Sequence, residues 1–148
     1  MTRYLDGIAE VERVVDGLTD AQLDHRPREG DWSAREIVHH LADSEMTSAI
    51  RLRRLLAEDN PVIVGYDEEE FARRLHYDTR PIGPSLAATR AARESTAAIL
   101  ERLSDADWER AGTHTESGGY SIDDWLRIYA AHCHDHAEQA RRAVAGQA

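Results

Sequence analysis

The chain has 148 residues, a mass of 16.7 kDa, a formal net charge of −10 and one cysteine. Its length predicts one domain, residues 1–148, that can bury a core without covalent staples, and the single cysteine excludes an internal disulfide framework. The acidic charge argues against a protein that binds nucleic acid through phosphate contacts. The sequence starts without a basic segment followed by an apolar run, and charges interrupt every later apolar stretch. We therefore expect a cytoplasmic protein that is neither secreted nor inserted in a membrane.

Hydrophobic periodicity predicts helices and almost nothing strand-like. Apolar residues recur at helical spacing from about Arg3 to Leu18, which predicts the first helix. The second begins at the capping box Ser33-Ala-Arg-Glu36, where the serine hydroxyl accepts from a free backbone amide and the glutamate reaches back. This helix is expected to end near residue 58, and it carries the apolar residues Ile37, Leu41, Ile50, Leu52, Leu55 and Leu56.

Two more helices are predicted after a long connection. Pro84-Ser85 opens the third helix, whose inward-facing residues are expected to be Leu86, Ile99, Leu100 and Leu103. The fourth begins at Ser121, extends to about Ala145 and has inner positions that include Trp125, Ile128 and Tyr129. Four long amphipathic helices in one small domain predict an all-α fold, a four-helix bundle with a long crossover between the second and third helices.

The crossover, residues 60–84, is longer than a simple helix connection in a compact bundle. Asp67-Glu-Glu-Glu70 can start a short helix with Phe71 and Leu75 as its apolar side. The segment is expected to span one end of the bundle, either as a pocket wall or lid or as a spacer that only closes the topology. Its three aromatic residues either line that pocket or anchor the segment: Tyr66, Phe71 and Tyr77.

Two connections between helices are alike. Leu18-Thr-Asp-Ala-Gln-Leu23 precedes Trp32-Ser33, and Leu103-Ser-Asp-Ala-Asp-Trp108 precedes Tyr120-Ser121. We interpret the chain as a degenerate repeat of a helix pair. If the two halves pack with approximate two-fold symmetry, the second and fourth helices face each other.

Three histidines occupy positions that such an arrangement brings together. His132 and His136 are four residues apart and share one face of the fourth helix. His40 follows the capping serine of its helix by seven residues and His132 follows that of its own by eleven, close to two and three full turns. The three side chains therefore project from the same sector relative to their helix starts. Three neutral imidazoles with an open fourth position suit a divalent ion, with zinc or nickel as the preferred metals.

The other histidines and the cysteine are not expected to bind this ion. His39 is about 100° around its helix from His40, and His134 is about 200° from its neighbours, so neither shares the ligand face. Cys133 is also off that face, which favours a small buried or interface residue over a nucleophile. The remaining three lie in predicted loops and are expected to be solvated: His25, His76 and His114.

Metal-bound imidazoles usually donate their free ring N–H to an acceptor nearby. Asp43 lies three residues after His40 on the same face, and Gln139 has the same relation to the second histidine of the pair on the fourth helix. These two residues are therefore the candidate acceptors. Glu36 shares the His40 face but belongs to the cap, and Glu45 is off that face and is expected to be structural.

These motifs together resemble the DinB-like superfamily of metal-binding four-helix bundles. The resemblance is carried by Trp-Ser-x-x-Glu-Ile-x-x-His-Leu-x-Asp-Ser-Glu around His40 and by His132-x-x-x-His136-x-x-Gln139, and it extends over nearly the whole chain. It implies that His40, His132 and His136 are the metal ligands. Many relatives have a second histidine just before the third ligand; Asp135 stands there in this chain, so no role is transferred to that position.

The resemblance also implies candidate functions. One is a thiol S-transferase that uses the metal and a low-molecular-weight thiol to act on small electrophiles. The alternatives are a metal-dependent hydrolase or a non-enzymatic stress-response protein with a structural metal. The family tendency to pair and the alanine-rich third helix predict a homodimer, and the partners are expected to be a small-molecule substrate and a thiol rather than nucleic acid or membrane.

Overall fold

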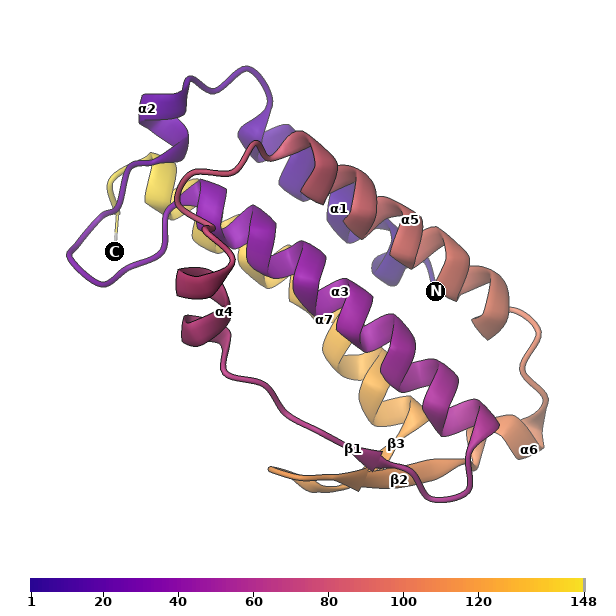
Figure 1. Ribbon diagram of the computed structural model, residues 1–148. Coiled ribbons are helices and arrows are strands. Elements are labelled where there is room, and N and C mark those ends of the chain that lie inside the picture. Colours follow the sequence, from indigo (N-terminus) through magenta and orange to yellow (C-terminus); the bar gives the residue numbers. More distant parts are fainter. Residues whose placement is uncertain (148) are drawn as a thin grey trace.

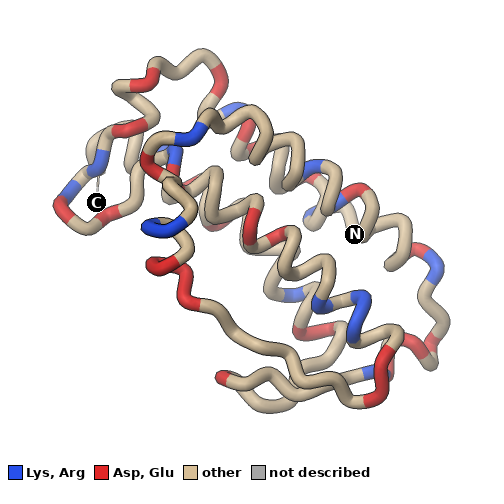
Figure 2. The backbone as a smooth tube through the Cα atoms, viewed as in Figure 1, with Lys and Arg blue, Asp and Glu red and all other residues tan. Residues whose placement is uncertain are grey.

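The computed structural model describes residues 1–147, whose backbone forms seven helices and three short strands (Figure 1). Four helices are long: α1 (Thr2–Val15), α3 (Ala34–Ala57), α5 (Gly83–Leu100) and α7 (Ile122–Val144). The short elements are α2 (Asp20–Leu23), β1 (Val62–Ile63), α4 (Glu68–Arg74), α6 (Asp105–Trp108), β2 (Ala111–His114) and β3 (Gly118–Ser121). Acidic and basic positions are interspersed along the backbone (Figure 2). No helix within these residues is long and apolar enough to cross a membrane.

The four long helices pack side by side as the predicted four-helix bundle. α1 lies against α7, α3 lies against both α5 and α7, and α5 also contacts α1. α3 and α5 run in the same direction, whereas α7 runs antiparallel to α3 (Figure 1). The predicted contact between the second and fourth long helices, α3 and α7, is therefore confirmed.

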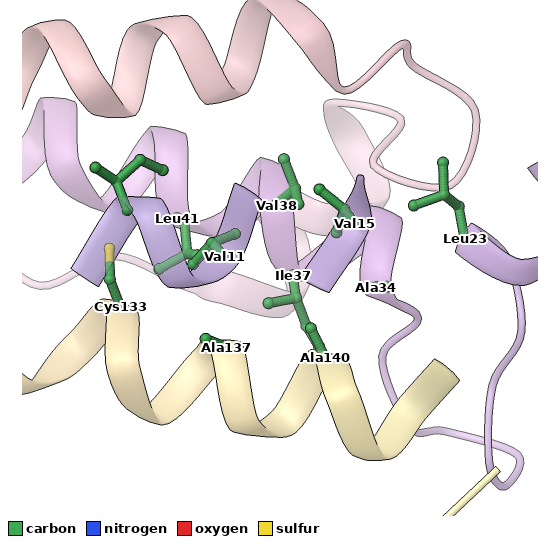
Figure 3. Close-up of a cluster of buried hydrophobic side chains, with 11 residues drawn as sticks. Val11, Val15, Leu23, Ala34, Ile37, Val38, Leu41, Cys133, Ala137 and Ala140 are labelled. Carbon is green, nitrogen blue, oxygen red and sulfur yellow. The ribbon is translucent and has the colours of Figure 1, made fainter. Parts of the chain in front are cut away.

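Two clusters of buried apolar side chains fill the bundle. One joins α1, the first half of α3 and the second half of α7, and it includes Val11, Leu41 and Cys133 (Figure 3). The other surrounds Trp125, whose ring lies 5.4 Å from that of Tyr4. Each fully buried large apolar side chain contributes about 1.5–3 kcal/mol. These clusters hold α3 and α7 in a fixed register along their contact.

A capping box opens each of α2, α3, α6 and α7. At the start of α3, Ser33 Oγ accepts from the Glu36 amide, and the Glu36 carboxylate accepts from the Ser33 amide at 2.8 Å. Thr19, Ser104 and Ser121 play the same part at the other three starts. Each half of the chain thus contains a short capped helix followed by a long capped helix, in agreement with the interpretation as a degenerate repeat.

The first helix ends at Val15, three residues earlier than predicted. Gly17 has a φ of 70°, in the left-handed region that favours glycine, and there the chain leaves the helix axis. Leu18 lies beyond this turn but still packs against the core. The apolar spacing therefore continues past the end of the helix, which is why periodicity alone overestimates its length.

Three short strands are the little strand structure that the described residues contain. β1 pairs with β2 in parallel, Val62 opposite Thr113, and β2 and β3 form an antiparallel hairpin. Each strand has only two to four residues, too few to show an alternating pattern. The strands also contain glycines, which weaken the sequence signal for a strand. Gly112 lies so close to the Pro61 carbonyl that a side chain would clash. The sheet ties the beginning of the crossover to the connection before α7.

The predicted crossover joins α3 to α5, but it runs back along the bundle instead of across one end (Figure 1). The reason is the parallel direction of α3 and α5, since the chain must return before α5 can start. Within it, α4 begins after Asp67, whose side chain accepts from the Glu70 amide, as predicted. Tyr77 anchors the segment, because its ring is buried and its hydroxyl donates to Asp43 Oδ2 at 2.5 Å.

The inner face of α5 is more polar than predicted. Of the residues expected to face inward only Leu100 is fully buried, and polar residues fill the face: Ser85, Thr89, Arg93 and Thr96. The Arg93 guanidinium is completely buried and donates to Glu45 Oε1 at 2.5 Å. On α7, Ile128 is likewise exposed rather than inward-facing. Hydropathy misses such a face because the partner that makes a buried arginine tolerable lies on another helix.

Candidate metal centre

His40 of α3 and His132 and His136 of α7 converge on one point. One ligand atom from each ring lies within 4.8 Å of the other two. The Nε2 atoms of His40 and His132 are 3.4 Å apart, and the rings of His132 and His136 meet edge to face with centroids 4.6 Å apart. The structure thus brings together the three residues singled out from helical spacing.

Helix geometry and aromatic packing produce this convergence. His132 and His136 are one turn apart on the face of α7 that meets α3. Trp32, just before the cap of α3, packs against His40 with ring centroids 4.9 Å apart. Tyr129, about one turn before His132, packs against that ring at 5.7 Å. Aromatic contacts therefore restrict the rings at both ends of the cluster.

Burial keeps the three imidazoles neutral. It lowers the pKa of His40 to about 3 and that of His132 to about 2, with smaller contributions from neighbouring histidines. Burial also lowers the pKa of His136, although a hydrogen bond to Gln139 opposes the shift. Because neutral imidazole is the form that binds metal ions, the cluster offers ligands rather than cations.

The spacing of the ring nitrogens fits a small divalent ion. Two nitrogens bound tetrahedrally at ordinary zinc distances are about 3.3 Å apart, and the His40 and His132 Nε2 atoms are separated by 3.4 Å. Three protein ligands leave one coordination position for water or substrate, an arrangement typical of catalytic zinc sites; structural sites usually have four protein ligands. The cluster therefore fits a catalytic ion.

Only one of the two expected acceptors orients a ligand. His136 Nδ1 donates to Gln139 Oε1 at 2.7 Å, which leaves Nε2 of that ring free for an ion. Asp43 has a different role from the one predicted, because its carboxylate accepts from the Tyr77 hydroxyl at 2.5 Å and so faces the crossover. The sequence shows that Asp43 shares a helix face with His40, but it does not show that a tyrosine from a distant segment docks on that face.

The immediate neighbours of the cluster face elsewhere, as helix geometry predicted. His39 is buried with Nδ1 2.8 Å from Ser85 Oγ, and it ties α3 to the start of α5. His134 lies beside α1, with Nδ1 3.0 Å from a Glu10 carboxylate oxygen. Cys133 is buried in the core, and burial raises the pKa of its thiol to about 12. Such a thiol is a packing residue rather than a nucleophile.

The remaining histidines and carboxylates take no part in the cluster. His25 and His76 are exposed in loops, as expected, whereas His114 lies at the end of β2 and not in a loop. Glu36 belongs to the cap of α3, as predicted. Glu45 is structural, as predicted, since it forms the completely buried ion pair with α5.

A cavity of about 440 Å³ opens beside His136. Trp32, from the loop before α3, and Gln139 of α7 line it, together with Glu68 and Glu69 of the first turn of α4. The crossover thus supplies part of the cavity wall. This placement favours the interpretation of the crossover as a pocket wall over that of a simple spacer.

Glu68 is a candidate functional residue that sequence reasoning missed. It lines the cavity beside the histidines, and burial, followed by repulsion from Glu69, raises the pKa of its carboxyl. The sequence shows only an acidic run, residues 67–70, which indicates a helix start. Which of these carboxylates enters the cavity depends on how α4 docks, and no local signal encodes that.

Comparison with known proteins gives relatives that share one kind of name. A protein of Oceanobacillus iheyensis, named "Putative metal-dependent hydrolase", is 41% identical over 126 residues, which are 85% of this chain and 73% of the relative. YfiT of Bacillus subtilis has the same kind of name and is 34% identical over 129 residues, 86% of this chain and 72% of YfiT. These names support a divalent metal in the histidine cluster.

The solved structure of YfiT has the same fold. It matches with a TM-score of 0.88 at 32% sequence identity, over 99% of this chain and 86% of YfiT. Its description, "a probable metal-dependent hydrolase with an unusual four-helix bundle topology", agrees with the bundle found here. Residues 4–140 match the DinB superfamily, a span that contains all three clustered histidines. The chain therefore belongs to the DinB superfamily.

Proposed function

We propose that this protein is a metal-dependent hydrolase of a small molecule. The observation that carries the proposal is the cluster of His40, His132 and His136, three neutral imidazoles of which His136 lines a cavity of about 440 Å³. The names of the relatives give further support. When bound there, a divalent ion, zinc or nickel by ligand preference, would lower the pKa of a coordinated water and polarise a carbonyl.

The residues around the cluster determine how this chemistry would be controlled. Gln139 fixes the His136 ring and Trp32 packs against His40, so the ligands are preorganised for the ion. Glu68 lines the same cavity, and burial raises the pKa of its carboxyl, which favours a group that takes a proton from water and returns it to a leaving group. We therefore assign Glu68 the role of proton acceptor.

Hydrolysis of a panel of small esters and amides by zinc- or nickel-loaded protein tests this function. We expect turnover that is abolished by His132→Ala and reduced about 10²–10⁴-fold by Glu68→Gln, with loss of the acidic limb of the pH profile. Glu70→Gln is the matched control, because Glu70 pairs with Arg73 and lies outside the lining of the cavity. Loaded protein that hydrolyses nothing in the panel, or activity that survives His132→Ala, would contradict the proposal.

The same assay distinguishes the thiol S-transferase implied by the resemblance. A transferase would turn over an electrophile only with added low-molecular-weight thiol, whereas a hydrolase needs none. In cobalt-substituted protein, a thiol on the ion would give a sulfur-to-metal charge-transfer absorption that disappears in His40→Ala. Turnover of the electrophile only in the presence of added thiol would favour the transferase. A bound ion without any turnover would favour a structural metal.

A further inference from the structure

Glu68 lines two cavities, the one beside His136 and a second of about 220 Å³. The second lies between α3, α7 and the β2–β3 hairpin, and its lining includes Arg51, Tyr66, Glu116 and Tyr129. Arg51 follows His40 on α3 by eleven residues, close to three full turns, so both side chains project from the same side of the helix. The two cavities are therefore neighbours that share the Glu68 side chain.

Arg51 is a cation without a carboxylate partner among residues 1–147. Its guanidinium donates to the Tyr129 hydroxyl at 3.2 Å and to the Val64 carbonyl at 2.7 Å, both uncharged acceptors. Its Nε is buried and has no hydrogen-bond partner in the described chain. The ring of Tyr66 lies 5.8 Å from the guanidinium. Buried donors without acceptors are unfavourable, so this side of the cavity favours a ligand with acceptor oxygens.

Other elements make the remaining walls acidic. Glu116, from the β2–β3 turn, packs against Gly65 so closely that a Cβ there would clash with its carboxylate. Glu68 adds a second carboxyl from α4. A simple anion would meet two carboxylates, and a simple cation would meet the guanidinium of Arg51. A ligand that carries both charges complements both sides.

We propose that the second cavity binds a zwitterionic amino-acid group, with its carboxylate at Arg51 and Tyr66 and its ammonium at Glu116. A volume of about 220 Å³ admits such a group with a short side chain. Because Glu68 borders both cavities, the rest of the ligand extends towards the histidines, and the substrate is an amino-acid derivative. That identification of the substrate rests on the proposed hydrolase function, whereas binding of the amino-acid group does not.

Titration with alanine, propionate and ethylamine, followed by calorimetry or NMR, tests this complementarity. Free amino acids also chelate metal ions, so the titrations use both the unmodified protein and the His136→Ala variant. We expect alanine to bind both proteins with similar affinity. Propionate and ethylamine should bind about tenfold more weakly or worse, because each lacks one of the two charge-assisted contacts.

Variants of the cavity complete the test. Arg51→Gln and Glu116→Gln should each weaken alanine binding about tenfold, and Glu116→Gln alters an exposed turn and leaves the Arg51 contacts intact. Arg54→Gln is the matched control, because Arg54 donates to the Val62 carbonyl just as Arg51 does to that of Val64, yet lies outside the lining.

Three results would overturn the proposal: no alanine binding, propionate binding as tightly as alanine, or alanine binding that is lost in His136→Ala and survives Arg51→Gln. The last would place the amino acid on the ion. Alanine binding with the expected variant pattern, but without any hydrolysis by the loaded protein, would remove the hydrolase function and keep the amino-acid site.

Discussion

The three imidazoles of the cluster are held in different ways. His136 is oriented by a hydrogen bond to Gln139, whereas His40 and His132 pack against aromatic neighbours. His132 Nδ1 is buried and has no hydrogen-bond partner in the part of the chain that the structure describes. The orientation of the His136 ring thus depends on one hydrogen bond, and that of the His40 and His132 rings on packing. Removal of the Gln139 acceptor should therefore affect His136 and leave the other two rings in place.

The first prediction for single residues concerns the metal content of the protein. Protein purified without chelator should contain about one zinc, nickel or similar ion per chain, because imidazole ligands suit these metals better than magnesium or calcium. His132→Ala should lose most of this metal. His134→Ala should keep it, since His134 Nε2 lies 2.9 Å from the Arg3 carbonyl, away from the cluster. Elemental analysis that finds equal metal in both variants would refute the assignment of the ligands.

The contact between Gln139 and His136 gives a second prediction. Gln139→Ala should weaken metal affinity about 10–100-fold, because the His136 ring loses the acceptor that fixes its tautomer and orientation. Competition with a chromophoric chelator measures the change. Glu138→Ala is the control, since Glu138 pairs with Arg141 on the exposed side of α7. An affinity equal to that of the unmodified protein would show that packing alone orients the ring.

At the scale of secondary-structure elements, one arginine ties the four long helices together. Arg93 of α5 donates to the Tyr4 carbonyl of α1, to Glu45 of α3 and to the Tyr129 carbonyl of α7. Its guanidinium also lies over the Tyr4 ring, 4.5 Å from the centroid. The pair with Glu45 is completely buried, so each charge depends on the other for compensation.

Removal of one member of this pair should therefore be costly. Arg93→Met leaves a buried Glu45 carboxylate without its cation and should lower the free energy of unfolding by roughly 3–5 kcal/mol. The double variant Arg93→Met, Glu45→Met should recover much of the loss, because it removes both charges. Urea unfolding of the unmodified protein, of Arg93→Met and Glu45→Met alone and of the double variant measures the coupling. Additive losses would show that the two charges do not compensate each other.

At the scale of the whole molecule, we expect a homodimer. Ala87, Ala91 and Ala98 are exposed on α5, where small side chains allow another helix to approach closely. Light scattering should give a mass of about twice 16.7 kDa, and Ala91→Arg, which places a bulky charge on this face, should shift the protein towards the monomer. A single species of 16.7 kDa at micromolar concentration would exclude the dimer.

The sequence by itself determined the long helices and the three clustered histidines. Helix periodicity and capping are local, since residues three or four apart meet whatever the rest of the chain does. Ser33 with Glu36 therefore predicted the start of α3, and His132 with His136 predicted a shared face. The repeated connections predicted the one long-range contact, that between α3 and α7. This contact was enough to place His40 beside His132 and His136.

Only the tertiary structure decided the contacts that depend on how elements dock. Asp43 meets Tyr77, Arg93 is buried against α3, and Glu68 enters a cavity because the crossover returns along the bundle. None of these pairings has a characteristic spacing in the sequence, since each joins segments whose distance in the chain says nothing about their distance in space. The residues of the histidine cluster were therefore predictable from helix geometry, whereas the groups that surround them and line the cavities required the folded molecule.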